Sequence, residues 1–286
     1  MIIKMKEIIV PPKYDNKKIV TFLLDNFNNL KQSTLQKALR QKDIRINNMR
    51  INSNEIIHAG DIIKVFISDE FLLGNTNLNI IFEDDNILVV DKPIGIEVVG
   101  NNSLTSQIQS KYITAQPCHR LDRNTSGLVL YAKNNDALNI LLDKFKNHEI
   151  EKFYKCEVWG IPSKKHSILK AYLFKDNSKS QVYISDTPKK GYREIITEYK
   201  VISLNLQSNT SVLEVILHTG RTHQIRAHLA HIGYPIIGDG KYGINEINKK
   251  FNKKTQVLSS LKLIFNFSSP SGILEYLNHK EIIKEN

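Results

Sequence analysis

The chain has 286 residues, 41% of them hydrophobic and 24% charged, with a formal net charge of +11 and a pI near 9.4. This apolar content allows a globular core, and no apolar run approaches the roughly 18 residues of a membrane-spanning helix. Two cysteines are too few for a disulfide framework, and the N-terminus lacks a signal-peptide pattern, so we expect a cytoplasmic protein with reduced thiols. The positive charge favours a polyanionic partner, although the richness in lysine, asparagine and isoleucine is also typical of an AT-rich genome.

The first part of the chain predicts a small α/β unit of short elements. We expect an extended lead-in over residues 1–15, followed by two helices over residues 16–30 and 33–40. A hairpin over residues 44–51 and a strand over residues 62–67 are expected next. Ser33 and Gln36 have the spacing of a capping box, which predicts that the second helix is capped at Ser33. A Gly-Asp turn precedes the final strand.

This order of elements resembles the small RNA-binding domain of the ribosomal protein S-four type. The segment 59–65 carries the clearest similarity, whereas Asn47-Asn48-Met49 replaces the usual Asn-Gly-Lys turn. The resemblance implies that basic side chains of this unit contact RNA phosphates, which position the RNA without reading its sequence. These side chains are Lys37, Arg40, Lys42, Arg45 and Arg50. The alternative is a charged face that is merely solvated.

Residues 78–286 predict a second domain of the α+β class, built on a mainly antiparallel, mixed β-sheet with few βαβ units. Strands are expected over residues 78–82, 87–90, 152–159, 168–174, 180–184, 193–203 and 211–217. Helices are expected over residues 103–112, 135–148 and 223–232. Thr222 is expected to cap the last helix and Gly233 to end it.

Two segments of this second domain are unusually rich in arginine. The 40 basic residues are 32 lysines and 8 arginines, and half of the arginines lie in residues 117–133 and 219–226. Arginine is needed in place of lysine where a planar, permanently charged group must bind in a bidentate manner. We therefore expect folding to bring the two segments together in one site. Their arginines are Arg120, Arg123, Arg221 and Arg226.

The carboxylate of Asp122, between Arg120 and Arg123, has three interpretations. It forms a structural ion pair, it takes part in a metal or acid–base site, or it is a nucleophile that a fixed guanidinium keeps ionised. Asp122 is the only acid between Glu97 and Asp136, so no carboxylate close in sequence supports the second interpretation.

Histidines are frequent in and after the second arginine segment. They are separated by five, five and three residues, which does not provide two metal ligands four residues apart on one helical face. We therefore predict no metal site, and expect most of these rings to cap or pack the helix. The residues are His218, His223, His228 and His231.

Four segments, in chain order, resemble the motifs of the RluA-type pseudouridine synthases. The opening, catalytic, middle and later motifs of that family are similar to Asp84–Gly95, His119–Leu128, Glu151–Cys156 and His218–Gly243. Two departures are visible: the opening motif is less hydrophobic after Gly95, and Leu258-Ser259-Ser260 stands where the family often has Leu-His-Ala. The implied organisation is an S-four-type RNA-binding domain, a linker and a catalytic domain, over residues 14–70, 71–77 and 78–286.

The resemblance implies roles for the motif residues. Asp122 matches the catalytic aspartate, and Arg226 matches the arginine that pairs with it. Tyr154 matches the tyrosine that stacks on the uracil, and Arg120 the side chain that fills the gap left when the target uridine flips out. Three further residues are expected to support the site, namely His119, Arg221 and His223.

The implied reaction is the isomerisation of uridine to pseudouridine in RNA, with large-subunit ribosomal RNA as the expected substrate. The N-glycosidic bond breaks, the uracil rotates, and its carbon 5 bonds to ribose carbon 1′. The residues leave open whether Asp122 attacks the ribose, attacks the base or abstracts a ribose proton. Because no P-loop or dinucleotide fingerprint is present, we expect no cofactor. We expect a monomer whose partner is RNA, with no membrane association.

Two other functions compete with this one. A non-catalytic RNA-binding or ribosome-assembly factor could keep the fold, but it would not need Asp122, Arg120, Tyr154 and Arg226 together. A metal-dependent hydrolase of nucleic acids would use the histidines, bind stoichiometric zinc and lose its activity when a chelator is added.

Overall fold

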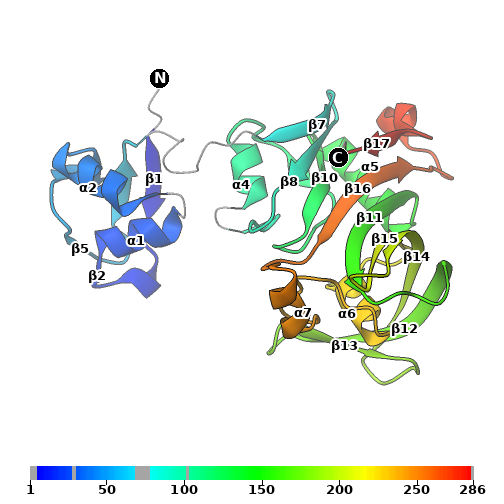
Figure 1. The fold of residues 1–286 in the computed structure, drawn as a ribbon. Helices are drawn as coiled ribbons and strands as arrows, with labels where there is room; N and C mark the ends of the chain where they lie inside the picture. Colours follow the sequence, from blue (N-terminus) through cyan, green and yellow to red (C-terminus); the bar gives the residue numbers. More distant parts are fainter. Residues whose placement is uncertain (1–4, 28–29, 68–77, 101–102, 285–286) are drawn as a thin grey trace. The chain divides into compact units, whose positions relative to one another are not determined.

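The computed structural model describes residues 5–27, 30–67, 78–100 and 103–284 (Figure 1). It divides into two compact units, Met1–Leu78 with Gly100–Ser110, and Asn79–Val99 with Lys111–Asn286. The predicted linker, residues 71–77, lies outside the described residues. None of the helices in the described part of the chain is long and apolar enough to cross a membrane.

The first unit contains a four-stranded antiparallel sheet with the strand order β1-β6-β3-β4. Its strands are β1 (Lys6–Ile9), β3 (Ile44–Ile46), β4 (Met49–Ile51) and β6 (Ile62–Val65), and β2 (Lys17–Lys18) pairs with β5 (Ile56–Ile57). Two helices, α1 (Ile19–Asn26) and α2 (Gln32–Arg40), bury apolar residues in one core with the strands. A short 3-10 helix, η1, spans Pro12–Tyr14.

The structure confirms the hairpin of the first unit and corrects two neighbouring predictions. Asn47 and Asn48 both adopt positive φ angles, 49° and 69°, as the tight turn of a hairpin requires. The lead-in contains β1, which pairs with β6 along its whole length. The capping box is wrong, because α2 begins at Gln32 with Lys31 as its N-cap and has no side-chain cap. An extended Lys31 backbone starts the helix two residues earlier than the Ser-Gln pattern indicates.

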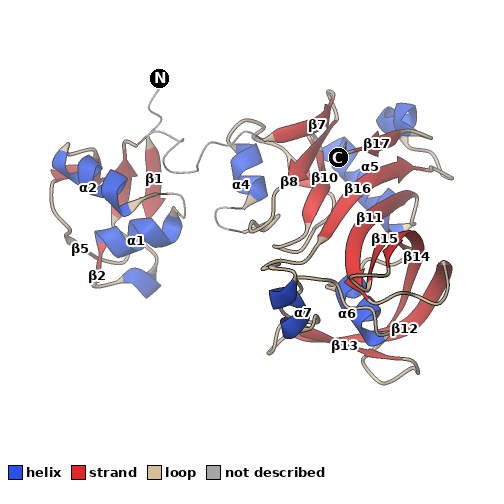
Figure 2. Ribbon diagram, in the orientation of Figure 1, coloured by secondary structure: helices blue, strands red, loops and turns tan. Residues whose placement is uncertain are grey.

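The second unit is built on an eleven-stranded sheet, and strands (red in Figure 2) dominate it. The strand order is β13-β12-β14-β15-β11-β16-β10-β8-β7, with β17 paired to β16 and β9 to β10. Every pairing is antiparallel except that of β10 with β16. The predicted α+β class and mainly antiparallel, mixed sheet are therefore confirmed.

The predicted strands of the second unit all form, within a few residues of the expected bounds. They are β7 (Asn79–Glu83), β8 (Ile87–Lys92), β10 (Ser126–Ala132), β11 (Ile150–Trp159), β12 (His166–Asp176), β13 (Gln181–Ser185), β14 (Arg193–Asn205) and β15 (Thr210–Leu217). Three further strands are β9 (Gln116–Pro117), β16 (Leu258–Phe265) and β17 (Glu281–Ile283). The helices of this unit are α5 (Asn135–Lys146), α6 (Gln224–His231) and α7 (Asn245–Lys250), with the 3-10 helix η2 (Gly272–Leu277). Helix α4 (Leu104–Gln109) falls within the Gly100–Ser110 segment that groups with the first unit.

Helix α6 differs from its prediction at its N-terminus. It is preceded by His223 as N-cap, in the left-handed conformation with φ of 53°, and no side chain caps it. Thr222 therefore does not cap this helix, because the chain turns sharply at His223 and not before it. The predicted end is confirmed, since Gly233 adopts a φ of 89° directly after the helix.

The parallel pairing of β10 with β16 places two backbones unusually close together. Gly127 faces Ser260 and has a φ of 108°, and a Cβ atom on Gly127 would lie 2.0 Å from the Ser260 carbonyl oxygen. Only glycine allows β10 to run from the arginine-rich segment into the sheet at this point. The Ser260 hydroxyl is buried here and has no hydrogen-bond partner among the described residues.

We predict that Ser260→Ala raises the free energy of unfolding by about 1 kcal/mol, because it removes an unsatisfied buried hydroxyl. Urea unfolding followed by fluorescence of Trp159, the single tryptophan, reports on the second unit. The matched control is Ser211→Ala. The Ser211 hydroxyl is equally buried but donates to the Gly160 carbonyl at 2.7 Å, so its removal should destabilise the protein. A Ser260→Ala variant less stable than wild type would contradict the prediction.

Candidate active site

The loop between β9 and β10, which carries Asp122, is tied down by a buried lysine. Lys92, at the end of β8, is fully buried and donates from Nζ to the carbonyl oxygens of Pro93 (2.9 Å), Ile96 (2.8 Å) and Arg123 (3.0 Å). Burial lowers its pKa to about 8, and the charge of Asp122 partly opposes this shift. Three carbonyls from two loops thus converge on one ammonium group, which fixes the backbone beside Asp122.

Side chains on both sides of Asp122 also hold the loop. Arg123 donates from Nε to the Gly95 carbonyl at 3.0 Å, and Gln256 donates from Nε2 to the Thr125 hydroxyl at 2.8 Å. The Thr125 amide donates to the Asp122 carbonyl at 3.1 Å, so the loop turns directly after the aspartate. Arg123 is therefore a structural residue, although the sequence suggested a role for it beside the carboxylate.

His119 anchors the start of the same loop to the sheet. Its Nε2 accepts the backbone amide of Leu130 at 3.1 Å, and its ring lies 5.1 Å from the Phe145 ring. Burial, with a smaller contribution from Lys152, lowers the pKa of His119 to about 3. The imidazole is therefore neutral at physiological pH and acts as a hydrogen-bond acceptor for β10.

One guanidinium links two carboxylates that are far apart in the sequence. Arg226 donates from Nη1 to Asp122 Oδ2 at 2.9 Å, and it binds Asp239 through Nε (2.7 Å) and Nη2 (3.0 Å). Asp239 Oδ1 also accepts the amides of Lys241 and Tyr242. No described residue donates a hydrogen bond to Asp122 Oδ1, so one oxygen of the carboxylate is held and the other is available to a substrate.

The charges of this triad reinforce one another. Burial would raise the pKa of Asp239, but hydrogen bonds and charge from Arg226 lower it overall. Burial would likewise lower the pKa of Arg226, and the two aspartates raise it above its ordinary value. Asp239 is fully buried, whereas the Asp122 side chain is 25% exposed. The buried pair thus fixes the guanidinium, which in turn presents its remaining edge to Asp122.

Helix α6 carries Arg226 and is locked by Gln224. The Gln224 side chain accepts hydrogen bonds from the Arg221 amide (3.0 Å) and the Thr219 hydroxyl (2.9 Å), and it donates to Ile196 and Thr197 of β14. These four contacts join the β15–α6 loop to the sheet. The left-handed His223 immediately before Gln224 is consistent with strain held at a functional site.

A chain of polar contacts runs from β13 to Asp122 through His223. The Val182 amide donates to the Tyr242 hydroxyl oxygen at 3.0 Å, and that oxygen lies 2.8 Å from His223 Nδ1. Because Val182 already donates to this oxygen, we assign the hydroxyl proton to the contact with Nδ1. The proton of neutral His223 then lies on Nε2, which faces Asp122 Oδ2 at 4.0 Å. Burial lowers the pKa of His223, and the charge of Asp122 partly opposes this.

Tyr154 lies on β11 where the pairing with β16 changes register, between Phe153 and Tyr154. Such an irregularity redirects a side chain. The ring is 5% exposed and lines the same cavity as Asp122. Burial, and next the charge of Asp122, raise the pKa of the Tyr154 hydroxyl. Tyr154 therefore presents a neutral aromatic surface beside the carboxylate.

The cavity has a volume of about 990 Å³ and brings both arginine-rich segments together. Arg120 and Arg221 are exposed on its wall, and most of the other ionisable side chains around it are basic. The predicted RNA contacts Lys37, Arg40 and Arg50 lie exposed on the first unit, on α2 and β4. Arg45 packs on the Phe66 ring at 4.7 Å, and its Nε is buried without a partner among the described residues.

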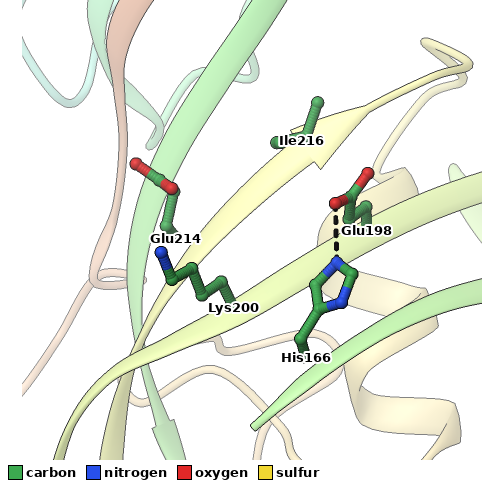
Figure 3. Close-up of a pocket in the computed structure, with 5 residues that line it drawn as sticks. All are labelled: His166, Glu198, Lys200, Glu214 and Ile216. Atoms are coloured by element: carbon green, nitrogen blue, oxygen red, sulfur yellow. Dashed lines mark hydrogen bonds and ion pairs between the residues drawn. The ribbon is translucent and has the colours of Figure 1, made fainter.

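A second, smaller cavity of about 320 Å³ lies on the sheet around Glu198 (Figure 3). Glu198 Oε1 lies 2.7 Å from His166 Nε2, and Oε2 lies 2.7 Å from His218 Nε2. Glu198 thus fixes the start of the loop that carries Arg221. In the described part of the chain, no group of three His, Cys, Asp or Glu residues could hold a metal ion.

Sequence reasoning missed two of the residues that organise the site. Lys92 lies within the opening motif, and the available signal was a lysine that ends an apolar strand before a proline. Asp239 lies within the later motif, and the available signal was an acidic residue between two glycines. Gly238 itself has a φ of 83°, and a Cβ atom there would lie 2.0 Å from the Thr255 carbonyl oxygen.

Comparisons with known proteins identify the family of the chain. A family model described as RNA pseudouridylate synthase matches residues 86–231. An uncharacterized RNA pseudouridine synthase of Mycoplasma genitalium is 32% identical over 285 residues, covering 90% of this chain and 88% of that protein. A protein named ribosomal large subunit pseudouridine synthase C, of Rickettsia bellii, is 34% identical over 245 residues, covering 76% of this chain and 80% of that protein.

A solved structure has the same fold at low sequence identity. Human RNA pseudouridylate synthase domain containing 1 superposes with a TM-score of 0.62 at 21% identity, covering 73% of this chain and 84% of that chain. The chain belongs to the RNA pseudouridylate synthase family, as its four RluA-type motifs predicted. It is an isomerase that acts on uridine in RNA.

We predict that Tyr242→Phe raises the pKa of His223, because the lost hydroxyl donates to Nδ1 and so favours the neutral ring. NMR titration of the imidazole resonances in wild type and variant measures this shift. His228 is the internal control, since its Nδ1 contacts Thr197 at 3.0 Å and lies outside the Tyr242 network. An unchanged or lowered pKa of His223 would show that the tautomer assignment is wrong.

Proposed function

We propose that Asp122 is the catalytic residue and that the enzyme modifies uridine in large-subunit ribosomal RNA. The observation that carries the catalytic assignment is the geometry at Arg226, which holds Asp122 Oδ2 at 2.9 Å while Oδ1 has no described donor. A carboxylate held by a fixed guanidinium and open on one side suits nucleophilic attack or proton abstraction. Both of these would proceed from Oδ1.

The reaction is balanced within the substrate. The bond between N1 and ribose carbon 1′ breaks and a bond from carbon 5 to carbon 1′ forms. Carbon 5 loses one proton and N1 gains one, so no external group donor is needed. Asp122 would hold the detached fragment covalently or remove a ribose proton. Arg226 would stabilise the negative charge of the carboxylate before it reacts and again when it is released.

Reaching the uridine requires that the base leave its stack. Tyr154 supplies the aromatic face on which an extruded uracil can stack, worth about 1–3 kcal/mol for such a contact. Arg120, exposed on the cavity wall, would occupy the gap left in the RNA. The desolvation of Tyr154 supports this assignment, because a neutral ring is what stacking on uracil requires.

One observation supports large-subunit ribosomal RNA as the substrate. The Rickettsia bellii relative carries that substrate in its name and is similar over 76% of this chain. The exposed basic side chains of the first unit would bind RNA phosphates, which supports an RNA substrate in general. Family membership favours this enzyme over the alternative of a non-catalytic assembly factor on the same fold.

We predict that Asp122→Asn lowers the rate of pseudouridine formation by at least about 10³-fold, because the nucleophile or base is lost. RNA binding and folding should survive, since Asn is nearly isosteric and Arg226 keeps its bidentate partner Asp239. Pseudouridine mapping in total RNA from cells with and without the gene provides the measurement. Loss of sites in large-subunit RNA should be restored by wild type and not by Asp122→Asn.

The matched control for this experiment is Asp136→Asn, an exposed acid in the first turn of α5. It should restore modification fully. Full modification by Asp122→Asn would refute the catalytic assignment. Loss of sites only in another RNA would refute the substrate assignment and leave the catalytic one intact.

We predict that replacing Lys37, Arg40 and Arg50 together by Gln weakens RNA binding and lowers the salt dependence. Each lost phosphate contact should reduce the slope of log affinity against log salt by about 0.7–0.9. Filter binding at several salt concentrations measures the slope. The same charge change at the exposed Lys164, Lys165 and Lys190 of the second unit is the control. Equal slopes for both triple variants would exclude a phosphate-binding role for the first unit.

A further inference from the structure

One amine in the active-site cavity lacks a negatively charged partner. Lys152 lies on β11, two residues before Tyr154, and lines the same cavity. Its Nζ lies 5.1 Å from the centre of the Phe145 ring, and no described residue forms a hydrogen bond or ion pair with it. Burial lowers the pKa of this amine. A cation removed from water without a counter-ion is costly, so its retention in a cavity calls for an anionic ligand.

Two further basic side chains from separate elements line the same cavity as Lys152. His148 follows the end of α5 in a left-handed turn with φ of 59°, and Arg221 lies in the loop between β15 and α6. Burial and then the charges of Lys152, His218 and Arg221 lower the pKa of His148, so its ring is neutral at physiological pH. Three different parts of the fold thus place two cations and one imidazole in this cavity.

The carboxylates near this cluster are bound to other groups. Glu198 is held by His166 and His218, and Asp122 by Arg226. Glu149, next to His148 in the chain, binds the buried Lys144 at 2.8 Å. The Glu151 carboxylate, next to Lys152, accepts a hydrogen bond from the Asn266 amide. Glu97 also lines the cavity and is exposed. No described acid forms an ion pair with Lys152, His148 or Arg221.

Gly220 leaves space beside the lysine amine. Its φ lies outside the left-handed region, so the backbone itself does not require glycine. A Cβ atom at this position would lie 3.8 Å from Lys152 Nζ, which is an ordinary contact distance. The absent side chain instead keeps open the volume next to the amine.

We propose that Lys152, with Arg221 and His148, forms a subsite for a backbone phosphate of the RNA strand that carries the target uridine. This subsite rests on the proposed function, in which the uracil stacks on Tyr154. Two residues of a strand span about 7 Å, so a base on Tyr154 places the phosphate of its own or an adjacent nucleotide within reach of Lys152. The subsite holds the strand while the base is extruded.

The test uses the full-length enzyme and a short large-subunit RNA hairpin that contains a mapped target uridine. One linkage at a time, around that uridine, is replaced by an uncharged methylphosphonate. In wild type, the replacement at the bound linkage should raise KM about tenfold, the scale of a charge-assisted hydrogen bond. Lys152→Gln should raise KM equally on unmodified RNA, with kcat changed less than twofold and a salt slope smaller by about 0.7–0.9.

The decisive result is non-additivity. At the bound linkage, methylphosphonate should raise the KM of Lys152→Gln by clearly less than it raises that of wild type, because only Arg221 and His148 still contact the phosphate. At other linkages the two penalties should multiply. Lys152→Arg should recover most of the wild-type KM because it keeps the charge. Gly220→Ala, which fills the space beside the amine and leaves Lys152 in place, should also raise KM. Lys155→Gln, an exposed lysine on the same strand, is the matched control and should behave as wild type.

Independent penalties at every linkage, or no rescue by Lys152→Arg, would overturn the phosphate subsite. A thermal unfolding profile of Lys152→Gln separates loss of binding from loss of folding. If Lys152→Gln unfolds at a lower temperature than wild type, the linkage scan in wild type, Lys152→Arg and Gly220→Ala tests the subsite in its place. Failure of wild type to form pseudouridine in this RNA would instead count against the proposed substrate, so the two failures are distinguishable.

Discussion

The guanidinium of Arg226, shared between Asp122 and Asp239, is the interaction on which the active site depends. The bidentate contact with buried Asp239 sets the plane of the group, and only then can Nη1 meet Asp122 at a defined oxygen. Two carboxylates and one guanidinium leave a net negative charge, which is placed on the partly exposed Asp122. The proposed catalytic carboxylate is therefore the exposed end of a buried network.

The scaffold supplies this precision through close backbone approaches. Gly127 allows β10 and β16 to pair in parallel directly after the aspartate loop, and Gly238 allows the turn that presents Asp239. Lys92 then joins the loop carrying Asp122 to the end of β8 with three hydrogen bonds. Each of these contacts fixes the backbone. The positions of Asp122 and Arg226 are therefore set by the edge of the sheet and not by the rotamer preferences of the two side chains.

Around this negative centre the cavity is positive, and the two features serve different parts of an RNA substrate. The base requires a neutral aromatic surface and a carboxylate, whereas the flanking backbone requires cations. In the function that we propose, Asp122 and Tyr154 would provide the first pair, and Arg120, Arg221 and Lys152 would provide the second. A single cavity can thus bind a strand by its phosphates while the chemistry is confined to one nucleotide.

The sequence by itself determined the α+β class, the predicted strands and the family, because strand alternation, helical spacing and the motif around Asp122 are local patterns. It also indicated that Arg226 would join Asp122, since arginine is scarce in this lysine-rich chain. Only the tertiary structure decided that Asp239 orients Arg226, that Lys92 holds the loop and that Lys152 has no ion-pair partner among the described residues. The contacts of the site join residues up to 131 positions apart, which no local pattern records. The N-caps Lys31 and His223 were not predicted from the sequence, because the backbone turns at these residues outweighed the capping preferences of Ser33 and Thr222.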